Sequence, residues 1–167
     1  TNFTGSLLVG HTTTGTLNAA TYNVGVGLTA LDAITSGDSN TAVGYGCMTD
    51  LTSGNYNMGL GSGAGGDITD GERNVSIGYG ANRLVTSGTR NVGVGMNAGY
   101  AVTGSRNTAL GNDAGINITS GDGNVMIGDV DAGSATGDRQ LKIGGYDGTT
   151  LTTWITGDSS GNVTMPA

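Results

Sequence analysis

Cationic and aromatic side chains recur at fixed steps along this 167-residue chain. Arg73, Arg90 and Arg106 follow one another at steps of 17 and then 16, and Tyr79 follows Tyr45 by two steps of 17. A row of guanidinium groups can bind anions or glycans, and tyrosine rings offer faces on which sugars stack. We therefore name these five residues as candidate ligand-binding positions. For the arginines, a solvated or salt-bridged edge of the fold is the alternative.

Patterns that would support catalysis are weak. His11 is the sole histidine and has only threonines directly after it, so no base is paired with a nucleophile in the sequence. The stretch 61–66 has the glycine spacing of a dinucleotide-binding loop, but it lies within a repeat and no helix follows it. Asp129 and Asp131 are more simply solvated turn carboxylates than an ion site. We expect no catalytic residue, no metal site, no cofactor and no enzymatic activity.

The charge balance restricts the partners. The chain has a net charge of −7 with only six Lys and Arg residues, whereas nucleic-acid binding depends on clustered basic residues. No segment approaches the 18 apolar residues of a membrane-spanning helix. We expect neither nucleic-acid binding nor membrane insertion.

One short sequence motif, an Asn followed four residues later by Gly, recurs along the chain. Successive copies follow at steps of 17, with a single step of 16. A fixed period this short predicts a solenoid, in which each coil buries its side chains by stacking on the next. The repeated positions are Asn23, Asn40, Asn57, Asn74, Asn91, Asn107 and Asn124, with Gly27, Gly44, Gly61, Gly78, Gly95, Gly111 and Gly128.

The residues between Asn and Gly alternate in character, as in a strand whose successive side chains point to opposite faces. The first and third are mostly aliphatic, as in Val24 and Val26, and the second is small, as in Gly25. A second apolar position recurs near Ile34 and is followed by Thr35 in a column of threonines. We expect an all-β parallel β-roll, a β-solenoid with a period of about 17 and two short strands per coil. The small face would meet the opposite wall of its own coil or a neighbouring subunit.

The Asn and the Thr that recur at one position in successive repeats, each set forming a column, have structural interpretations. The Asn side chains would form an internal ladder that bonds the turn of the next coil. The threonines would form a stacked ladder, although a row of threonines on a solenoid also suggests an ice-binding surface as a rival function. Cys47 occupies a column of alanines, which predicts a small buried residue rather than a reactive thiol. The threonines are Thr35, Thr52, Thr69, Thr86, Thr103, Thr119 and Thr136.

The columns divide the chain into three parts. Residues 1–22 would form an N-terminal cap and a degenerate first coil, and residues 23–144 the solenoid repeats. Residues 145–167 depart from the repeat.

The phrases at 40–44, 74–78 and 107–111 resemble the head repeats of trimeric autotransporter adhesins and the repeats of phage tail fibres. The resemblance covers residues 6–144. It implies a homotrimer on a virion or bacterial cell exterior that binds a cell-surface receptor or glycan. The segment 154–164 resembles the stretch that precedes self-cleaving chaperone domains in such fibres. We expect a structural and adhesive fibre segment, with a glycan-binding fibre tip as a further alternative.

Overall fold

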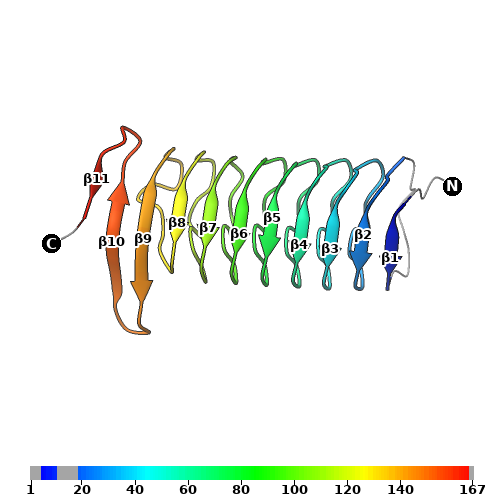
Figure 1. The fold of residues 1–167 in the computed structure, drawn as a ribbon, viewed down its shortest axis with the longest axis horizontal. Helices are drawn as coiled ribbons and strands as arrows, with labels where there is room; N and C mark the ends of the chain where they lie inside the picture. Colours follow the sequence, from blue (N-terminus) through cyan, green and yellow to red (C-terminus); the bar gives the residue numbers. More distant parts are fainter. Residues whose placement is uncertain (1–4, 11–18, 166–167) are drawn as a thin grey trace.

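The fold is a single column of stacked coils. A computed structural model describes residues 5–10 and 19–165, and over these residues the chain forms one sheet of eleven strands and no helix. Neighbours in sequence are neighbours in the sheet, so the strands follow one another from the N-terminal to the C-terminal end (Figure 1). The strands are β1 Leu7–Val9, β2 Val24–Val26, β3 Thr41–Val43, β4 Met58–Leu60, β5 Val75–Ile77, β6 Val92–Val94, β7 Thr108–Leu110, β8 Val125–Ile127, β9 Leu141–Tyr146, β10 Leu151–Gly157 and β11 Val163–Thr164.

Strands β1 to β9 pair in parallel and in repeat register. Val75 of β5 pairs with Val92 of β6 at a sequence step of 17, whereas Val92 pairs with Thr108 of β7 at a step of only 16. The shorter coil loses its residue in the turn at Gly104, so the strands stay in phase as the sequence predicts. The expected parallel β-solenoid and its period are confirmed.

The expectation of two strands per coil is wrong, because each fully described coil contains one strand. The segment around Leu51 and Thr52, where the second strand was expected, makes coil-to-coil backbone bonds such as Thr52 N to Thr69 O at 2.9 Å. It is nevertheless built from tight turns, with Leu51 N donating to Met48 O at 3.3 Å and Met48 at φ +49°. Turn bonds within the coil alternate with bonds between coils, so no continuous ladder forms.

The interior is lined by the small face of the strands. Ala42, Ser76 and Ala109, at the middle of their strands, are 0 to 2% exposed, whereas the aliphatic residues beside them are half-buried or exposed. At Gly59 a Cβ atom would collide with the Sγ of Cys47 in the preceding coil. The small face therefore meets the opposite wall of its own solenoid, which was one of the two expected arrangements.

Two positions share the limited interior volume. In one pair of coils Met48 fills the space from the loop side and Gly59 leaves room for it on the next strand. In a later pair of coils the sizes are reversed: Gly115 stands at the loop position of Met48, and Met126 stands at the strand position of Gly59 and fills the space. The side chains of Met48 and Met126 are both fully buried. Close packing of this kind requires that a large residue on one wall face a small one on the other.

The C-terminal end changes from parallel to antiparallel pairing within β9. Leu141 of β9 pairs in parallel with Val125 of β8, and the same strand pairs antiparallel with β10. β10 pairs in turn with β11, and a register shift lies between Thr153 and Ile155. β9 crosses the boundary drawn after residue 144, so the last repeat continues directly into a small antiparallel sheet.

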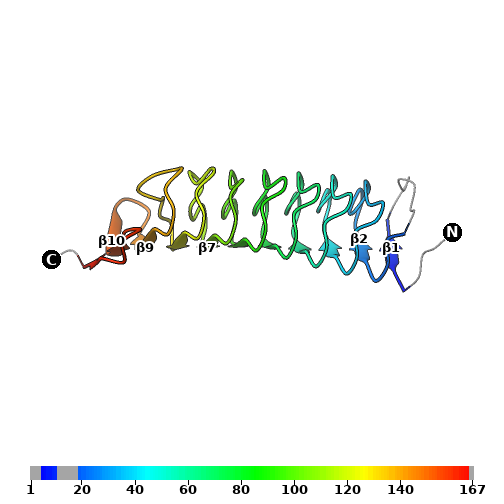
Figure 2. The same cartoon turned by 90° about the horizontal axis from the view of Figure 1, so that it is seen from above.

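The sheet has one covered and one uncovered face. From β2 to β9, the loop parts of the coils stand on the same side of the strands, as the view from above shows (Figure 2). Within the described part of the chain no helix is long and apolar enough to cross a membrane.

Candidate functional site

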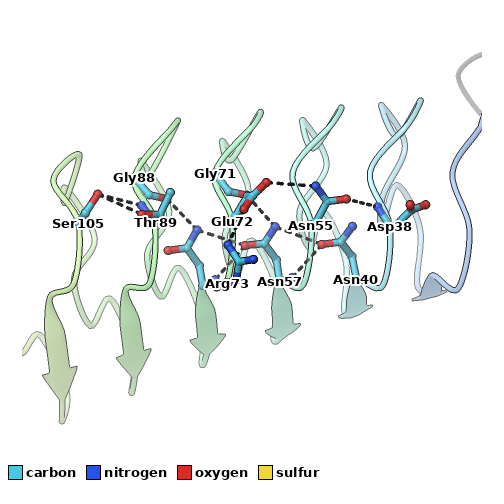
Figure 3. Close-up of polar contacts among 11 residues, drawn as sticks. Asp38, Asn40, Asn55, Asn57, Gly71, Glu72, Arg73, Gly88, Thr89 and Ser105 are labelled. Atoms are coloured by element: carbon cyan, nitrogen blue, oxygen red, sulfur yellow. Dashed lines mark hydrogen bonds and ion pairs between the residues drawn. The ribbon is translucent and has the colours of Figure 1, made fainter.

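A ladder of buried Asn side chains runs along the solenoid at the entrance to the strands. Asn57 Nδ2 donates to Asn40 Oδ1 at 3.1 Å and to the turn carbonyl of Gly71 at 2.8 Å, while its own Oδ1 accepts from the backbone N–H of Asn74 at 3.0 Å (Figure 3). Equivalent bonds recur from Asn23 to Asn124. The predicted internal ladder is confirmed, and these side chains are not accessible to a ligand.

The ladder continues into both degenerate ends of the repeat. Ser6 stands in the first Asn position and its Oγ accepts from Asn23 N at 2.9 Å. Gln140 stands in the last, where its Nε2 donates to Asn124 Oδ1 at 3.1 Å. These flanking coils are joined to the regular ones by the same chemistry.

A second polar ladder, not recognised in the sequence, lies two residues before each Asn. Asp38 N donates to Asn55 Oδ1 at 2.7 Å, Asn55 Nδ2 donates to Glu72 Oε1 at 3.2 Å, and Thr89 N donates to Ser105 Oγ at 3.1 Å (Figure 3). Its signal is the recurrence of side chains with an acceptor oxygen, which varies too much in residue type to form an obvious column. The members are Thr21, Asp38, Asn55, Glu72, Thr89, Ser105, Asp122 and Asp138.

The candidate arginines lie between the two ladders, in left-handed backbone conformation. Arg73, Arg90 and Arg106 have φ values of +58° to +61° and exposed side chains. Arg73 Nη1 contacts Glu72 Oε2 at 2.7 Å, and its guanidinium carbon lies 5.4 Å from the centre of the Tyr56 ring. At Arg73 the structure therefore shows the salt-bridged edge that was the alternative to an anion-binding stripe.

Tyr45 and Tyr79 line a different surface, at the opposite end of the strands. Both rings are exposed, at 63 and 62%, and they border a cavity of about 310 Å³. Arg83, which the sequence analysis did not select, lines the same cavity, and its Nε is 3.1 Å from Asp67 Oδ1. The hydrogen bond to Asp67 raises the pKa of Arg83, so this side chain stays cationic.

The five candidate residues thus separate into two groups. The arginines precede the strands and the tyrosines follow them, so each strand lies between the two groups. The positions of the arginines and tyrosines within the repeat already place the two groups apart. The spacing alone does not show which edge of the coils holds a cavity.

The uncovered sheet face carries two in-register aliphatic rows, which we call the outer face. Several members are strongly exposed, including Met58 at 47% and Leu60 at 50%. One row is Leu7, Val24, Thr41, Met58, Val75, Val92, Thr108, Val125 and Leu141; the other is Val9, Val26, Val43, Leu60, Ile77, Val94, Leu110, Ile127 and Ile143. The aliphatic side chains of the strands therefore lie outside the core.

The threonine column forms hydrogen bonds with its own backbone. Thr35 Oγ1 donates to Thr52 O at 3.1 Å and Thr52 Oγ1 donates to Thr69 O at 3.0 Å. Thr103 Oγ1 likewise donates to Thr119 O at 3.3 Å, and Thr119 Oγ1 donates at 3.2 Å to the carbonyl of Ala135, the residue before Thr136. These hydroxyl protons stabilise the stack of coils, as the structural interpretation predicts.

Cys47 and Asp131, two of the residues considered for chemistry, have structural partners in the described part of the chain. Cys47 is buried, and desolvation raises the pKa of its thiol to about 12 despite an opposing hydrogen bond with the Val43 backbone. Asp131 Oδ1 accepts from Asn117 N at 3.2 Å. Across residues 5–10 and 19–165, no three His, Cys, Asp or Glu side chains are grouped to hold a metal ion. His11 lies outside the described residues.

No family model, curated protein or solved structure matches this chain.

Proposed function

We propose that this chain is a structural and adhesive segment of a homotrimeric fibre on a virion or bacterial cell exterior, without catalytic activity. The observation that carries the proposal is the outer face. Two rows, aliphatic except for Thr41 and Thr108, remain partly or strongly exposed over nine consecutive strands, and no segment in the described part of the chain folds over them (Figure 2).

A contiguous apolar face of this length is unusual for a monomer. Nine strands spaced about 4.8 Å apart give rows about 40 Å long. Large apolar patches with a regular shape mark interaction surfaces, and permanent interfaces are the most hydrophobic class. Two rows of half-exposed aliphatic side chains approach the scale of about 800 Å² that each partner buries in a stable complex.

A second copy of the same chain is the partner that fits this face best. In a closed threefold ring, one row of each copy would face the other row of its neighbour, which leaves no binding face free. The equal coil height of every copy keeps the rows in register along the whole column. The resemblance of the Asn-to-Gly phrases to trimeric fibres favours three copies around one axis.

The thin interior gives a physical reason for assembly. Much of the core consists of Ala side chains, such as Ala64, Ala81 and Ala98, which contribute little burial energy per ordered residue. Burial of the outer face would add aliphatic area where the single column lacks it. A fibre role needs this stability and an elongated shape, and it needs no reactive site.

The ice-binding alternative receives less support. It requires a flat array of hydroxyl groups that order water, whereas Thr35, Thr52, Thr103 and Thr119 donate their hydroxyl protons to backbone carbonyls. The flat surface of this solenoid is the outer face, and it is mainly aliphatic.

Mass measurement in solution tests the assembly. Light scattering after gel filtration should give three times the 16.4 kDa chain mass, and a monodisperse monomer would overturn the proposal. Leu60→Asp, on the outer face, should shift the protein toward monomer. Leu84→Asp is the matched control, because Leu84 is 37% exposed but lies in the loop part of its coil, and it should leave the mass unchanged. Equal behaviour of the two variants would place the interface elsewhere.

A further inference from the structure

The cavity beside Tyr45 is a slot that the repeat itself creates. Tyr45, Ser62 and Tyr79 occupy equivalent positions in three successive coils, at steps of 17. The small Ser62 therefore leaves a gap between two exposed rings. Coils stack about 4.8 Å apart, so equivalent atoms of the two tyrosines are about 9.6 Å apart. A six-membered ring that contacts an aromatic face on each side, at about 4 Å per contact, needs about 8 Å, so the gap is wide enough to admit one such ring.

The floor of the slot is polar and open. Thr29, Thr49 and Ser62 line it with hydroxyl groups, and the guanidinium of Arg83 lies over Gly63, where a Cβ atom would be 3.1 Å from Nη1. At Gly46 a Cβ atom would approach only the Thr29 Oγ1, at 3.9 Å, so the space above this residue is empty of protein atoms. The cavity volume of about 310 Å³ lies at the lower end of the range of ligand pockets.

Arg83 supplies hydrogen-bond donors to one wall of the slot, and its acidic partner Asp67 lies beside the slot without lining it. Arg83 uses its Nε on Asp67 Oδ1 at 3.1 Å, which leaves the two terminal nitrogens of the guanidinium as donors. The side chain of Arg83 is partly exposed, at 42%, and so is reachable by a ligand.

We infer that this slot binds one ring of a neutral saccharide between Tyr45 and Tyr79, with its hydroxyl groups on Arg83 and the threonines. A sugar ring presents apolar C–H faces for the two aromatic rings and hydroxyl groups, each a donor and an acceptor, for the wall and floor. A neutral ligand is favoured over an anionic one because Asp67 already balances the charge of Arg83 and the chain carries −7 overall. The inference rests on the adhesive role proposed above and specifies its ligand class.

The experiment begins with the full chain on an array of neutral oligosaccharides of glucose, galactose, mannose and their N-acetylated amino sugars. Sialylated and uronate-containing versions of the same oligosaccharides are included. Neutral members should bind, and the acidic versions should bind no better. Binding of the acidic members alone would overturn the inference in favour of an anion site, and binding of no member would overturn it outright.

Ser62→Tyr is the decisive variant. It places a third ring between Tyr45 and Tyr79 and fills the slot without removing any contact, and neighbouring coils show that this position accepts tyrosine. Titration with the best neutral oligosaccharide should show binding lost. Met96→Tyr adds a ring to the same row outside the slot and should bind as the unaltered chain does. Equal binding by both variants would overturn the inference.

Removal of either ring should weaken binding about tenfold, the effect of losing one stacking contact of about 1.4 kcal/mol. Tyr45→Ala and Tyr79→Ala are compared with Tyr56→Ala, which removes a ring of similar exposure, 59%, from the opposite edge. A Tyr56→Ala loss as large as the others would contradict the location of the site. The oligomer mass is measured on the same samples. A trimer that binds no sugar contradicts only the slot, and a monomer that binds sugar contradicts only the trimeric fibre.

Discussion

Asn57 and Asn40, in equivalent positions of adjacent coils, are joined side chain to side chain at 3.1 Å inside the solenoid, and each is at most 2% exposed. The same Asn57 amide donates to the Gly71 carbonyl at 2.8 Å, and its oxygen accepts a hydrogen bond from the backbone N–H of Asn74, the next Asn of the ladder. One residue type thus satisfies backbone and side-chain groups of several coils at once. This relationship explains why the position is Asn in seven consecutive coils.

Asn57→Ala should destabilise the protein by about 2 to 5 kcal/mol, because it leaves buried groups of Asn74 and Gly71 without their partners. Denaturant unfolding at fixed chain concentration measures the change. Asn55→Ala is the control in the same coil: its partners lie in the half-exposed ladder, where water replaces the lost bonds, and the cost should be about 1 kcal/mol or less. Equal losses of unfolding free energy in the two variants would show that the buried ladder contributes no more to stability than the half-exposed one.

Gly78→Val should prevent folding or lower the melting temperature by many degrees. Gly78 has φ +124°, and an added Cβ would collide with the carbonyl oxygen of Gly95 in the next coil. Gly148→Val separates the two causes, because Gly148 has φ +97° and an added Cβ would meet no atom within 4 Å. The control variant bears backbone strain of about 1 to 2 kcal/mol alone. Thermal unfolding followed by circular dichroism should show a much larger loss for Gly78→Val.

Gly115 and Met126 should be exchangeable as a pair. Met126→Gly opens a cavity that costs about 2 to 5 kcal/mol, and Gly115→Met alone overfills the same space. The double variant reproduces the arrangement of Met48 and Gly59 elsewhere in the column, so its stability should lie within about 1 to 2 kcal/mol of the unaltered chain, the backbone strain of a side chain at φ +59°. A double-variant cycle measures the coupling between the two sites, and additive losses would contradict the shared volume.

Cys47 should make stability fall at alkaline pH. Burial raises the pKa of its thiol from an ordinary value of 9.0 to about 12, so the unfolded chain ionises first. The contribution is fully present below pH 9 and is lost as the pH rises toward 12, at about 1.4 kcal/mol per pH unit. Denaturation midpoints at pH 8 and pH 10.5, compared with those of Cys47→Ala, isolate this effect from other titrating groups. Parallel pH profiles for the two proteins would contradict it.

Much of the candidate site was visible in the sequence, but its grouping was not. Tyr45 and Tyr79 could be selected from their spacing, and their distance of two coils follows directly from the period. Arg83 was missed because neither its position nor that of Asp67 recurs as a charged column. Its role depends on the loop that brings these side chains of adjacent coils together, which no spacing rule describes.

The number of strands per coil shows a second limit. The apolar position at Leu51 and the threonine after it recur as regularly as the strand residues, so they suggested a second strand. Regular recurrence shows that a position has the same environment in every coil, but not that its backbone is extended. Positive φ at residues such as Met48 and Asn82 turns this part of the chain instead.

The sequence by itself determined the period of the solenoid, the phase of its strands and the Asn ladder, because identical side chains at a fixed spacing can bond one another only when the coils stack in register. Only the tertiary structure decided which strand face lies inside. Both faces repeat with equal regularity, and apolar character alone favoured burying the aliphatic one. The narrow coil has room between its walls for small side chains such as Ala42 and Gly59, so volume prevailed over hydrophobicity and the aliphatic rows remain on the outer face.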